Sequence, residues 1–295
     1  MRRADAIVVG AGPAGLIAAT YLARFRRSVI VLDGGPPRAL WIPESHNTPG
    51  FPGGIGGREL VARLRRQAES FGAQIVTARA DAIRPDEGGI EVSADGETYA
   101  CRLALLATGL VDNKPDLPGL DAAILQSLVR MCPICDAFEA VGKRIAVLGD
   151  GPLGLREARF LRTFSQDVTL LHVGAALAAD EVHGLAGDGV TAVAFELTGL
   201  GFAVDHVAAH VGGELHRFDC LYLALGCRMN SEIAVAVGAA HDDDLNLRVD
   251  DHQRTSVQDL YAAGDVVRGL NQITVAGGEA AIAATAMHNR LREWP

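Results

Sequence analysis

The sequence predicts an α/β protein in which a second domain is inserted into the first. Two parts of the chain repeat the same order of a short apolar run, a glycine-rich turn, a helix-like segment and another apolar run, which is typical of a βαβ unit. A long alanine-rich segment from about 277 to 291 predicts a further helix near the end. The 295 residues suffice for about two domains.

The composition excludes several classes of protein. Hydrophobic residues make up 49% and charged residues 21%, which indicates a packed core and excludes disorder, collagen and coiled coil. The 27 basic and 36 acidic residues give a net charge of −9, and the basic residues form no long block. We therefore expect neither a nucleic-acid groove nor a polybasic membrane anchor. The 34 glycines indicate tight turns and close approach of backbone to a ligand.

The uncharged stretch 6–23 follows Met1-Arg2-Arg3 and could be a signal peptide with a basic start and an apolar centre. We favour a buried strand, a glycine turn and a helix, because Asp5 interrupts the basic start and residues 10–15 read Gly-Ala-Gly-Pro-Ala-Gly. A bilayer crossing would also need about 20 residues. The expectation is a cytoplasmic protein without a leader.

The first βαβ unit carries a dinucleotide fingerprint. It consists of a strand at 6–9, a turn, a helix at 16–25 and a strand at 28–33. In the turn, Gly10 permits the tight bend, Gly12 lets the backbone approach a pyrophosphate, and Gly15 lets helix and strand pack closely. Asp33 follows Gly15 by 18 residues, where a carboxylate accepts hydrogen bonds from a ribose 2′-hydroxyl. The alternative is a glycine-rich turn that binds no ligand.

The second unit has the same glycine spacing but lacks the acidic partner for a ribose. It consists of a strand at 144–148, a helix at 155–164 and a strand at 168–172, and its glycines are Gly149, Gly151 and Gly154. Both units place proline directly after the second glycine, where its missing N–H costs nothing. His172-Val173-Gly174 then offers neither an acid for a 2′-hydroxyl nor an arginine for a 2′-phosphate. A second nucleotide site and a structural copy without nucleotide both remain open.

Two apolar runs that end in glycine, 103–109 and 221–226, resemble the returning strand of each unit. Each is followed by a polar, loop-like stretch. A linker is expected at 112–118, which holds two prolines, and a second boundary near 238–244. The predicted domains are therefore 1–113 with 238–295, and 114–237 inserted between them.

The close pair Cys132-Pro133-Ile134-Cys135, followed by Asp136, is the strongest chemical signal. Two cysteines at this spacing on the first turn of a helix can form a reducible disulfide, and a helix N-terminus lowers a thiol pKa. Half of a zinc site and inert core cysteines are the alternatives. A structural zinc needs four ligands, whereas the remaining cysteines are isolated: Cys101, Cys220 and Cys227. No metal site is expected.

Taken together, these residues resemble the low-molecular-weight thioredoxin reductase family of FAD-dependent pyridine nucleotide-disulfide oxidoreductases over nearly the full length. The motifs that carry the resemblance, in order, are the fingerprint 10–15, Asn47-Thr48-Pro49-Gly50, Ala107-Thr108-Gly109, Cys132-x-x-Cys135-Asp136, Ala263-Gly264-Asp265 and Gln272. The order of these parts is more specific than any one of them.

The resemblance implies two Rossmann-like three-layer domains, the FAD domain being split around the second, and a homodimer. It implies that FAD is held by Gly10, Gly12, Pro13, Ala14, Gly15, Asp33, Asn47, Thr108, Gly109, Gly264, Asp265, Gln272 and Ile273. It also implies an electron relay in which Cys135 faces the flavin, Cys132 attacks the partner's disulfide, and Asp136 protonates the leaving thiolate. The partner would be a thioredoxin-like protein or a small dithiol or disulfide.

The chain departs from that family at the second nucleotide site. The NADPH-dependent members carry His-Arg-Arg where this chain has His172-Val173-Gly174. The electron donor, whether NADPH, NADH, a ferredoxin or another reductant, therefore stays open. The same cysteines could also work in reverse, in a dithiol oxidase that passes electrons to oxygen. A flavin-binding sensor without turnover is the alternative from another class.

Overall fold

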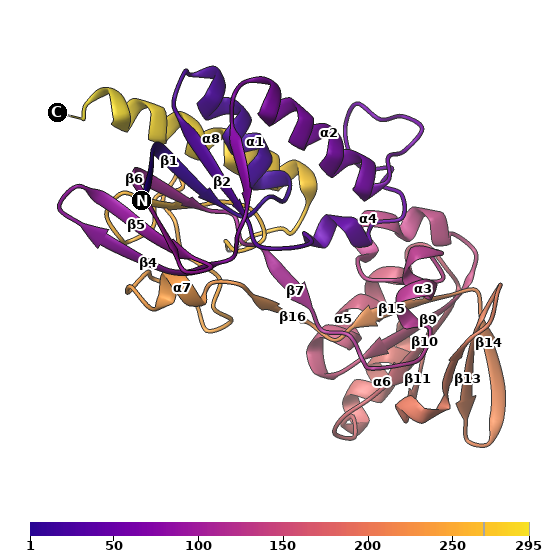
Figure 1. Ribbon diagram of the computed structural model, residues 1–295. Helices are drawn as coiled ribbons and strands as arrows, with labels where there is room; N and C mark the ends of the chain where they lie inside the picture. Colours follow the sequence, from indigo (N-terminus) through magenta and orange to yellow (C-terminus); the bar gives the residue numbers. More distant parts are fainter. Residues whose placement is uncertain (268, 295) are drawn as a thin grey trace.

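The computed structural model describes residues 1–267 and 269–294, which form two parts, each built on a large sheet, joined by a narrow link (Figure 1). The strand order of the first sheet is β3-β2-β1-β6-β5-β4, and β17 pairs with β6. Its strands are β1 (Arg2–Val9), β2 (Val29–Asp33), β3 (Gln74–Thr77), β4 (Ala80–Asp86), β5 (Gly89–Ala94), β6 (Glu97–Leu106) and β17 (Leu260–Ala262). β1, β2, β3, β6 and β17 run parallel, whereas β4 and β5 form an antiparallel arm.

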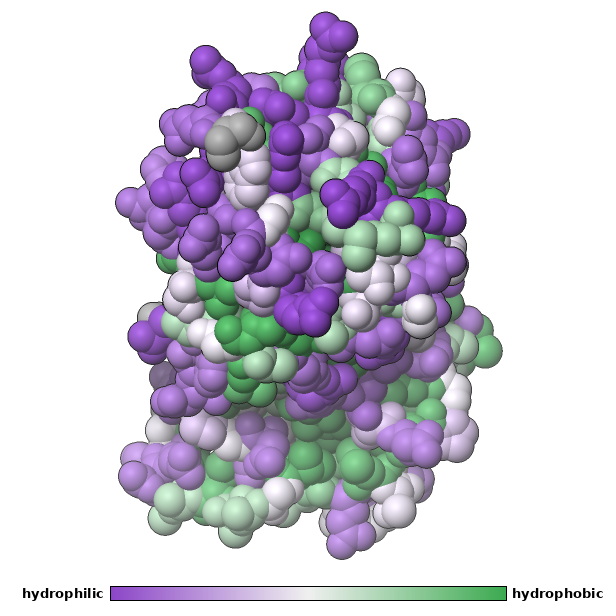
Figure 2. Space-filling model, turned by 60° about the vertical axis from the view of Figure 1, so that its left-hand side comes forward, coloured by the Kyte–Doolittle hydropathy of each residue, from purple (hydrophilic) through white to green (hydrophobic). Residues whose placement is uncertain are grey.

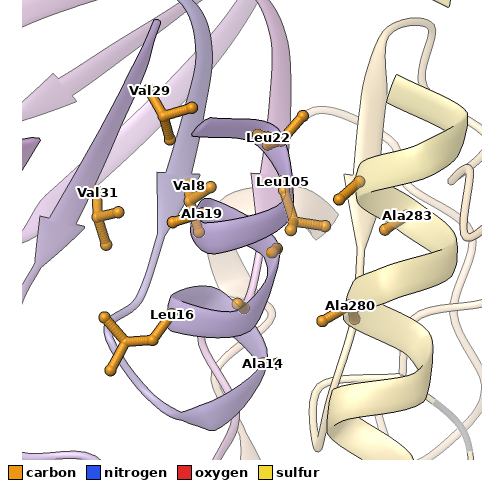
Figure 3. Close-up of a cluster of buried hydrophobic side chains, with 14 of the residues drawn as sticks. Val8, Ala14, Leu16, Ala19, Leu22, Val29, Val31, Leu105, Ala280 and Ala283 are labelled. Carbon is orange, nitrogen blue, oxygen red and sulfur yellow. The ribbon is translucent and has the colours of Figure 1, made fainter. Parts of the chain in front are cut away.

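Three helices cover one face of the first sheet: α1 (Pro13–Arg24), α2 (Gly57–Ser70) and α8 (Ile273–Arg292). Alternate strand residues point to opposite faces, so one set packs under these helices and the other set packs against the β4–β5 arm and the segment 233–267. Figure 3 shows α1 between the strands and α8, with side chains from Val8, Leu16, Ala19, Leu22, Val29, Val31, Leu105, Ala280 and Ala283. This core fixes the N-terminus of α1 at the end of β1.

The second sheet has the strand order β11-β10-β9-β15-β8, with every pair parallel. Its strands are β8 (Val129–Arg130), β9 (Arg144–Gly149), β10 (Asp167–His172), β11 (Val190–Ala194) and β15 (Cys220–Ala224). One face packs against α5 (Gly151–Leu161) and α6 (Ala179–Gly187). The other packs against α3 (Leu120–Leu125) and a small antiparallel sheet made of β12 (Leu200–Phe202), β13 (Val207–Val211) and β14 (Glu214–Phe218).

The link between the sheets differs from the expectation of polar loops after the two returning strands. β7 (Leu110–Asp112) and β16 (Cys227–Met229) pair antiparallel, with Asp112 opposite Cys227. The chain leaves the first sheet through β7 and returns through β16 into α7 (Glu232–Val235). Strands of three residues without alternation of apolar and polar residues carry no periodic signal in the sequence. They form because the two chain segments that connect the large sheets run side by side and satisfy each other's backbone hydrogen-bonding groups. The domain boundaries at 113 and 238 stay a prediction.

The expected α/β class is confirmed by this architecture. Among the described residues, no helix combines the length and the apolar character that a bilayer crossing requires. Figure 2 shows one face of the molecule, on which hydrophilic side chains dominate the upper part and hydrophobic ones gather across the middle.

Candidate active site

A cavity of about 460 Å³ extends from the first glycine turn to the paired cysteines. Its wall contains most of the residues that the sequence singles out: Gly10, Gly12, Pro13, Ala14, Asn47, Thr108, Gly109, Cys132, Cys135, Asp136, Gly264, Asp265, Gln272 and Ile273. These residues come from six separate segments of the chain, so the fold brings together what the sequence distributes. Gly15 and Asp33 are not part of this wall.

The three glycines of the first turn have different structural roles. Gly10 has a φ of +111°, and a Cβ on it would lie 2.2 Å from the carbonyl oxygen of Ala107. A Cβ on Gly15 would lie 1.9 Å from the carbonyl oxygen of Gly10, so Gly15 serves helix–strand packing. A Cβ on Gly12 would meet only Pro37, at 3.6 Å. Packing thus requires Gly10 and Gly15, whereas Gly12 matters for what enters the cavity.

The N-terminus of α1 fits a bound pyrophosphate. The helix begins at Pro13 without a side-chain cap on Gly12, so the N–H groups of its first turn are left for an anion. Such a terminus also carries a partial positive charge. The donor set in this part of the cavity therefore suits the phosphates of FAD.

Asp33 lies in an adjoining cavity, also of about 460 Å³, which shares residues 34–37 and Arg79 with the first. Its carboxylate is paired with the guanidinium of Arg65. The expected ribose contact would place Asp33 beyond the pyrophosphate, and Asp33 stands next to the residues that the two cavities share. Ribose binding by Asp33 stays a prediction.

Asp265 is held by an arginine that sequence reasoning missed. Arg38, in the short helix η1 (Arg38–Trp41), contacts Asp265 at 3.2 Å and Asp112 at 2.8 Å. Burial raises the pKa of Asp265, and the charge of Arg38 opposes this rise. Arg38 stands in a glycine- and proline-rich loop, where nothing in the sequence indicates two acidic partners more than 70 residues away.

The paired cysteines form a disulfide at the start of α4 (Pro133–Asp136), with an S–S distance of 2.04 Å. The amide Nε2 of Gln272 donates to the sulfurs of Cys132 and Cys135 at 3.5 and 3.3 Å. The Oε1 of Gln272 accepts a hydrogen bond from Nδ2 of Asn47 at 3.0 Å. Three segments that the sequence assigns to the flavin and to the disulfide therefore meet at one amide group.

The other three cysteines are free, as expected. Burial raises the pKa of Cys101 to about 12 and that of Cys220 to about 11, so both remain thiols near neutral pH. Cys227 is exposed, and its pKa is raised by partial burial and by Asp112. Within residues 1–267 and 269–294, no group of three or more His, Cys, Asp or Glu side chains could hold a metal ion.

The second fingerprint forms the turn between β9 and α5. A Cβ on Gly149 would lie 2.6 Å from the Cα of Gly154, so these two glycines serve close packing. Gly149, Gly151 and Gly154 line neither of the two cavities described above. Gly174 has a φ of +102°, and a Cβ there would lie 2.5 Å from Oδ1 of Asp150 in the same turn. Nucleotide binding at this turn stays a prediction.

Comparison with known proteins agrees with this arrangement. The family model for pyridine nucleotide-disulphide oxidoreductases matches residues 4–280. The chain is 31% identical to a bifunctional thioredoxin reductase/thioredoxin of Mycobacterium leprae, with 98% of this chain and 66% of that protein covered. It is 28% identical to a thioredoxin reductase of Peptoclostridium litorale, with 98% and 97% covered.

Solved structures show the same fold. The crystal structure of HlmI gives a TM-score of 0.88 at 26% identity, with 98% of this chain and 92% of that one covered. The thioredoxin reductase of Streptococcus pyogenes gives a TM-score of 0.89 at 25% identity, with 99% of both chains covered. The cavity, the disulfide in its wall and these similarities agree: the chain belongs to the pyridine nucleotide-disulphide oxidoreductase family, as a thioredoxin reductase-like enzyme that uses FAD.

Proposed function

We propose that this enzyme passes two electrons between FAD, the Cys132–Cys135 disulfide and the disulfide or dithiol of a thioredoxin-like protein. One observation carries the proposal. The disulfide lies in the wall of the same cavity as the first glycine turn, and Gln272 contacts both sulfurs. The relative from Mycobacterium leprae, whose name includes both a reductase and a thioredoxin, supports this class of partner.

Each part of the cavity has a distinct task in the proposal. FAD, when bound, supplies the chemistry of accepting and releasing electron pairs. The first turn of α1, next to Gly12, would hold the pyrophosphate, and Asp265 would hold the ribityl chain. Gln272 and Asn47 fix the disulfide at the flavin end of the cavity, because their amides link the two sulfurs to the loop at 45–50.

In the reductase direction, the thiolate of Cys132 attacks one sulfur of the partner's disulfide. The other partner sulfur leaves with the bonding electron pair and takes a proton from the carboxyl group of Asp136. The thiolate of Cys135 then attacks Cys132, which restores the intramolecular disulfide and releases the second partner sulfur. All steps are reversible, so the same residues serve a dithiol oxidase.

Three large hydrophobic side chains on the redox turn and just after it are exposed. Ile134, Phe138 and Val141 are 52%, 79% and 58% exposed. Large exposed hydrophobic side chains that cluster beside a reactive group are typical of a docking surface. We infer that the partner protein packs on these three side chains.

Phe138→Ala is expected to raise the KM for a thioredoxin about 5- to 30-fold with little change in kcat, because an aromatic anchor contributes about 1–2 kcal/mol. Steady-state assays with thioredoxin and with a small disulfide measure this. The small disulfide should react as before, and Val204→Ala, which alters a side chain that is 95% exposed elsewhere, is the control. An unchanged KM for thioredoxin would remove Phe138 from the partner surface.

An anaerobic titration of the flavin absorbance tests the proposed function and its direction. The purified protein is treated in turn with NADPH, NADH, a reduced ferredoxin and a small dithiol. A reductase is bleached by a reduced donor and reoxidised by a disulfide, whereas an oxidase is bleached by dithiols and makes peroxide in air. A protein that does neither is a sensor, and the proposal would be wrong.

We expect NADPH to reduce the flavin poorly. The positions that would hold the 2′-phosphate carry Val173 and Gly174, and Gly174 adopts a φ of +102° that strains any other side chain. Loss of two arginine–phosphate contacts should weaken the affinity about 10- to 1,000-fold, and NADH, which lacks the phosphate, should suffer less. Rapid-mixing measurements of flavin reduction check this. Fast reduction at micromolar NADPH would show that another group binds the phosphate.

Further parts of the proposal rest on the resemblance. We propose that residues 1–113 and 238–295 form the FAD-binding domain, that 114–237 form the inserted domain, and that two chains form a homodimer in the cytoplasm. Light scattering of the purified protein tests the dimer.

A further inference from the structure

The turn that carries the redox cysteines packs on two side chains from neighbouring strands. β8 and β15 run parallel, and Arg130 pairs in register with Tyr222. Register partners in a sheet lie on the same face. Arg130 is only 7% exposed, and Tyr222 is fully buried. The sheet therefore presents a buried positive charge and a phenol side by side, and Arg130 stands two residues before Cys132 in the chain.

Both side chains donate hydrogen bonds to Asp136. The Nη1 of Arg130 lies 3.2 Å from Oδ2 of Asp136 and 2.9 Å from its main-chain carbonyl oxygen. The hydroxyl of Tyr222 lies 3.0 Å from Oδ1 and 3.2 Å from the same carbonyl oxygen. Both carboxyl oxygens and the carbonyl of one residue are thus held by two buried donors.

This contact lies where the redox turn ends. Asp136 is the last residue of α4, and its φ of −149° and ψ of 17° lie outside the helical region. Its carbonyl lies at the start of the short 3-10 helix η2 (Ala137–Ala140), and Arg130 and Tyr222 donate to this oxygen from the neighbouring strands. The same two residues fix the position of the cysteine-bearing turn and the direction of the carboxyl group.

We propose that Arg130 and Tyr222 are positioning residues that hold Asp136 beside the cysteines and stabilise the carboxylate that remains after Asp136 has given its proton to the departing sulfur. This inference rests on the proposed role of Asp136 as the acid. The bonds made and broken are those of the exchange described above. Arg130 adds the charge that pairs with the new carboxylate, so the proton leaves without an uncompensated buried anion.

The groups around Asp136 show in which direction the removal of Arg130 would shift the pKa of Asp136. Burial raises the pKa of Asp136, and Arg130 and Tyr222 oppose this rise. Glu139, which follows on the same segment, raises it further. Cys220, on β15 behind Tyr222, stays a neutral thiol, since burial raises its pKa to about 11. Arg130 is therefore the cation that lowers the pKa of Asp136.

Removal of Arg130 should raise the pKa of Asp136 by about one to three units, the usual effect of a close opposite charge. The rate at which reduced holoenzyme reacts with a small disulfide, measured by rapid mixing against pH, has an alkaline limb where Asp136 loses its proton. We expect Arg130→Gln to move this limb upward by that amount. Tyr222→Phe should move it in the same direction by less, and Arg130→Lys should return it toward the unmodified position.

Infrared titration of the carboxyl C=O stretch gives a readout that does not depend on turnover. The band is measured in the oxidised holoenzyme and is assigned by its absence in Asp136→Asn. It should persist to higher pH in Arg130→Gln by the same shift. A purely structural role of Arg130 would change stability or flavin content and leave this titration where it was.

The outcomes separate the inference from the proposed function. If Asp136→Asn keeps the alkaline limb, Asp136 is not the acid and that part of the proposed function is wrong. If Asp136→Asn removes the limb but neither Arg130→Gln nor Tyr222→Phe shifts it, the inference alone is overturned. If Arg130→Gln does not fold, Tyr222→Phe, which removes one hydrogen bond and no charge, decides by the presence or absence of its upward shift.

Discussion

Replacing Cys132 with serine is expected to abolish turnover with disulfide partners, with a loss of at least about 1,000-fold, because a serine hydroxyl does not displace a thiolate from a disulfide and Cys135 is assigned to the flavin side. Cys132 and Cys135 form the only disulfide among the described residues, and the pKa values of Cys101, Cys220 and Cys227 are raised. The variant should leave Cys135 as a thiolate next to the flavin. A long-wavelength absorption band of the purified protein measures this.

Thiol counting and a matched variant control this prediction. In the unmodified protein, the number of titratable thiols under denaturing conditions should rise by two upon reduction, from three to five. Cys227→Ser, which changes an exposed free cysteine outside the disulfide, should keep full activity and lack the long-wavelength band. If Cys132→Ser shows no band and retains disulfide exchange, the relay lies elsewhere in the molecule.

Gly12→Val is expected to weaken FAD binding by at least about 100-fold, which corresponds to about 2.7 kcal/mol. A Cβ at Gly12 has room, since its nearest neighbour would be Pro37 at 3.6 Å, but the branched side chain would enter the cavity at the N-terminus of α1. The loss of affinity is measured by the ratio of flavin to protein after purification and by titration of the folded apoprotein with FAD. The fold should persist, because the change touches no core contact.

A glycine outside the cavity is the control for this change. Gly278 lies on an exposed face of α8, and a Cβ there would meet nothing within 4 Å. Gly278→Ala should keep one FAD per chain and stabilise the helix slightly. If Gly12→Val bound a full complement of FAD, the pyrophosphate would lie elsewhere than the first glycine turn.

The local parts of this protein could be predicted from its sequence. The strand, turn and helix at 6–25 follow from an apolar run, a glycine spacing and a proline at the first helical position, all of which act over a few residues. The same holds for the paired cysteines at a helix start and for the isolated cysteines that remain thiols. Such features depend on neighbours in the chain, and short-range geometry determines them.

Only the tertiary structure determined which residues far apart in the chain come into contact. The pairing of β7 with β16, the bridge from Arg38 to Asp112 and Asp265, and the hydrogen bond from Tyr222 to Asp136 join segments far apart in the chain. Arg38 and Arg130 stand in the sequence like any solvent-exposed arginine, and only burial against acids makes their charge matter. The hydrophobic periodicity of a sequence indicates which face of a helix or strand is buried. The packing of the sheets and helices determines which side chain it meets there.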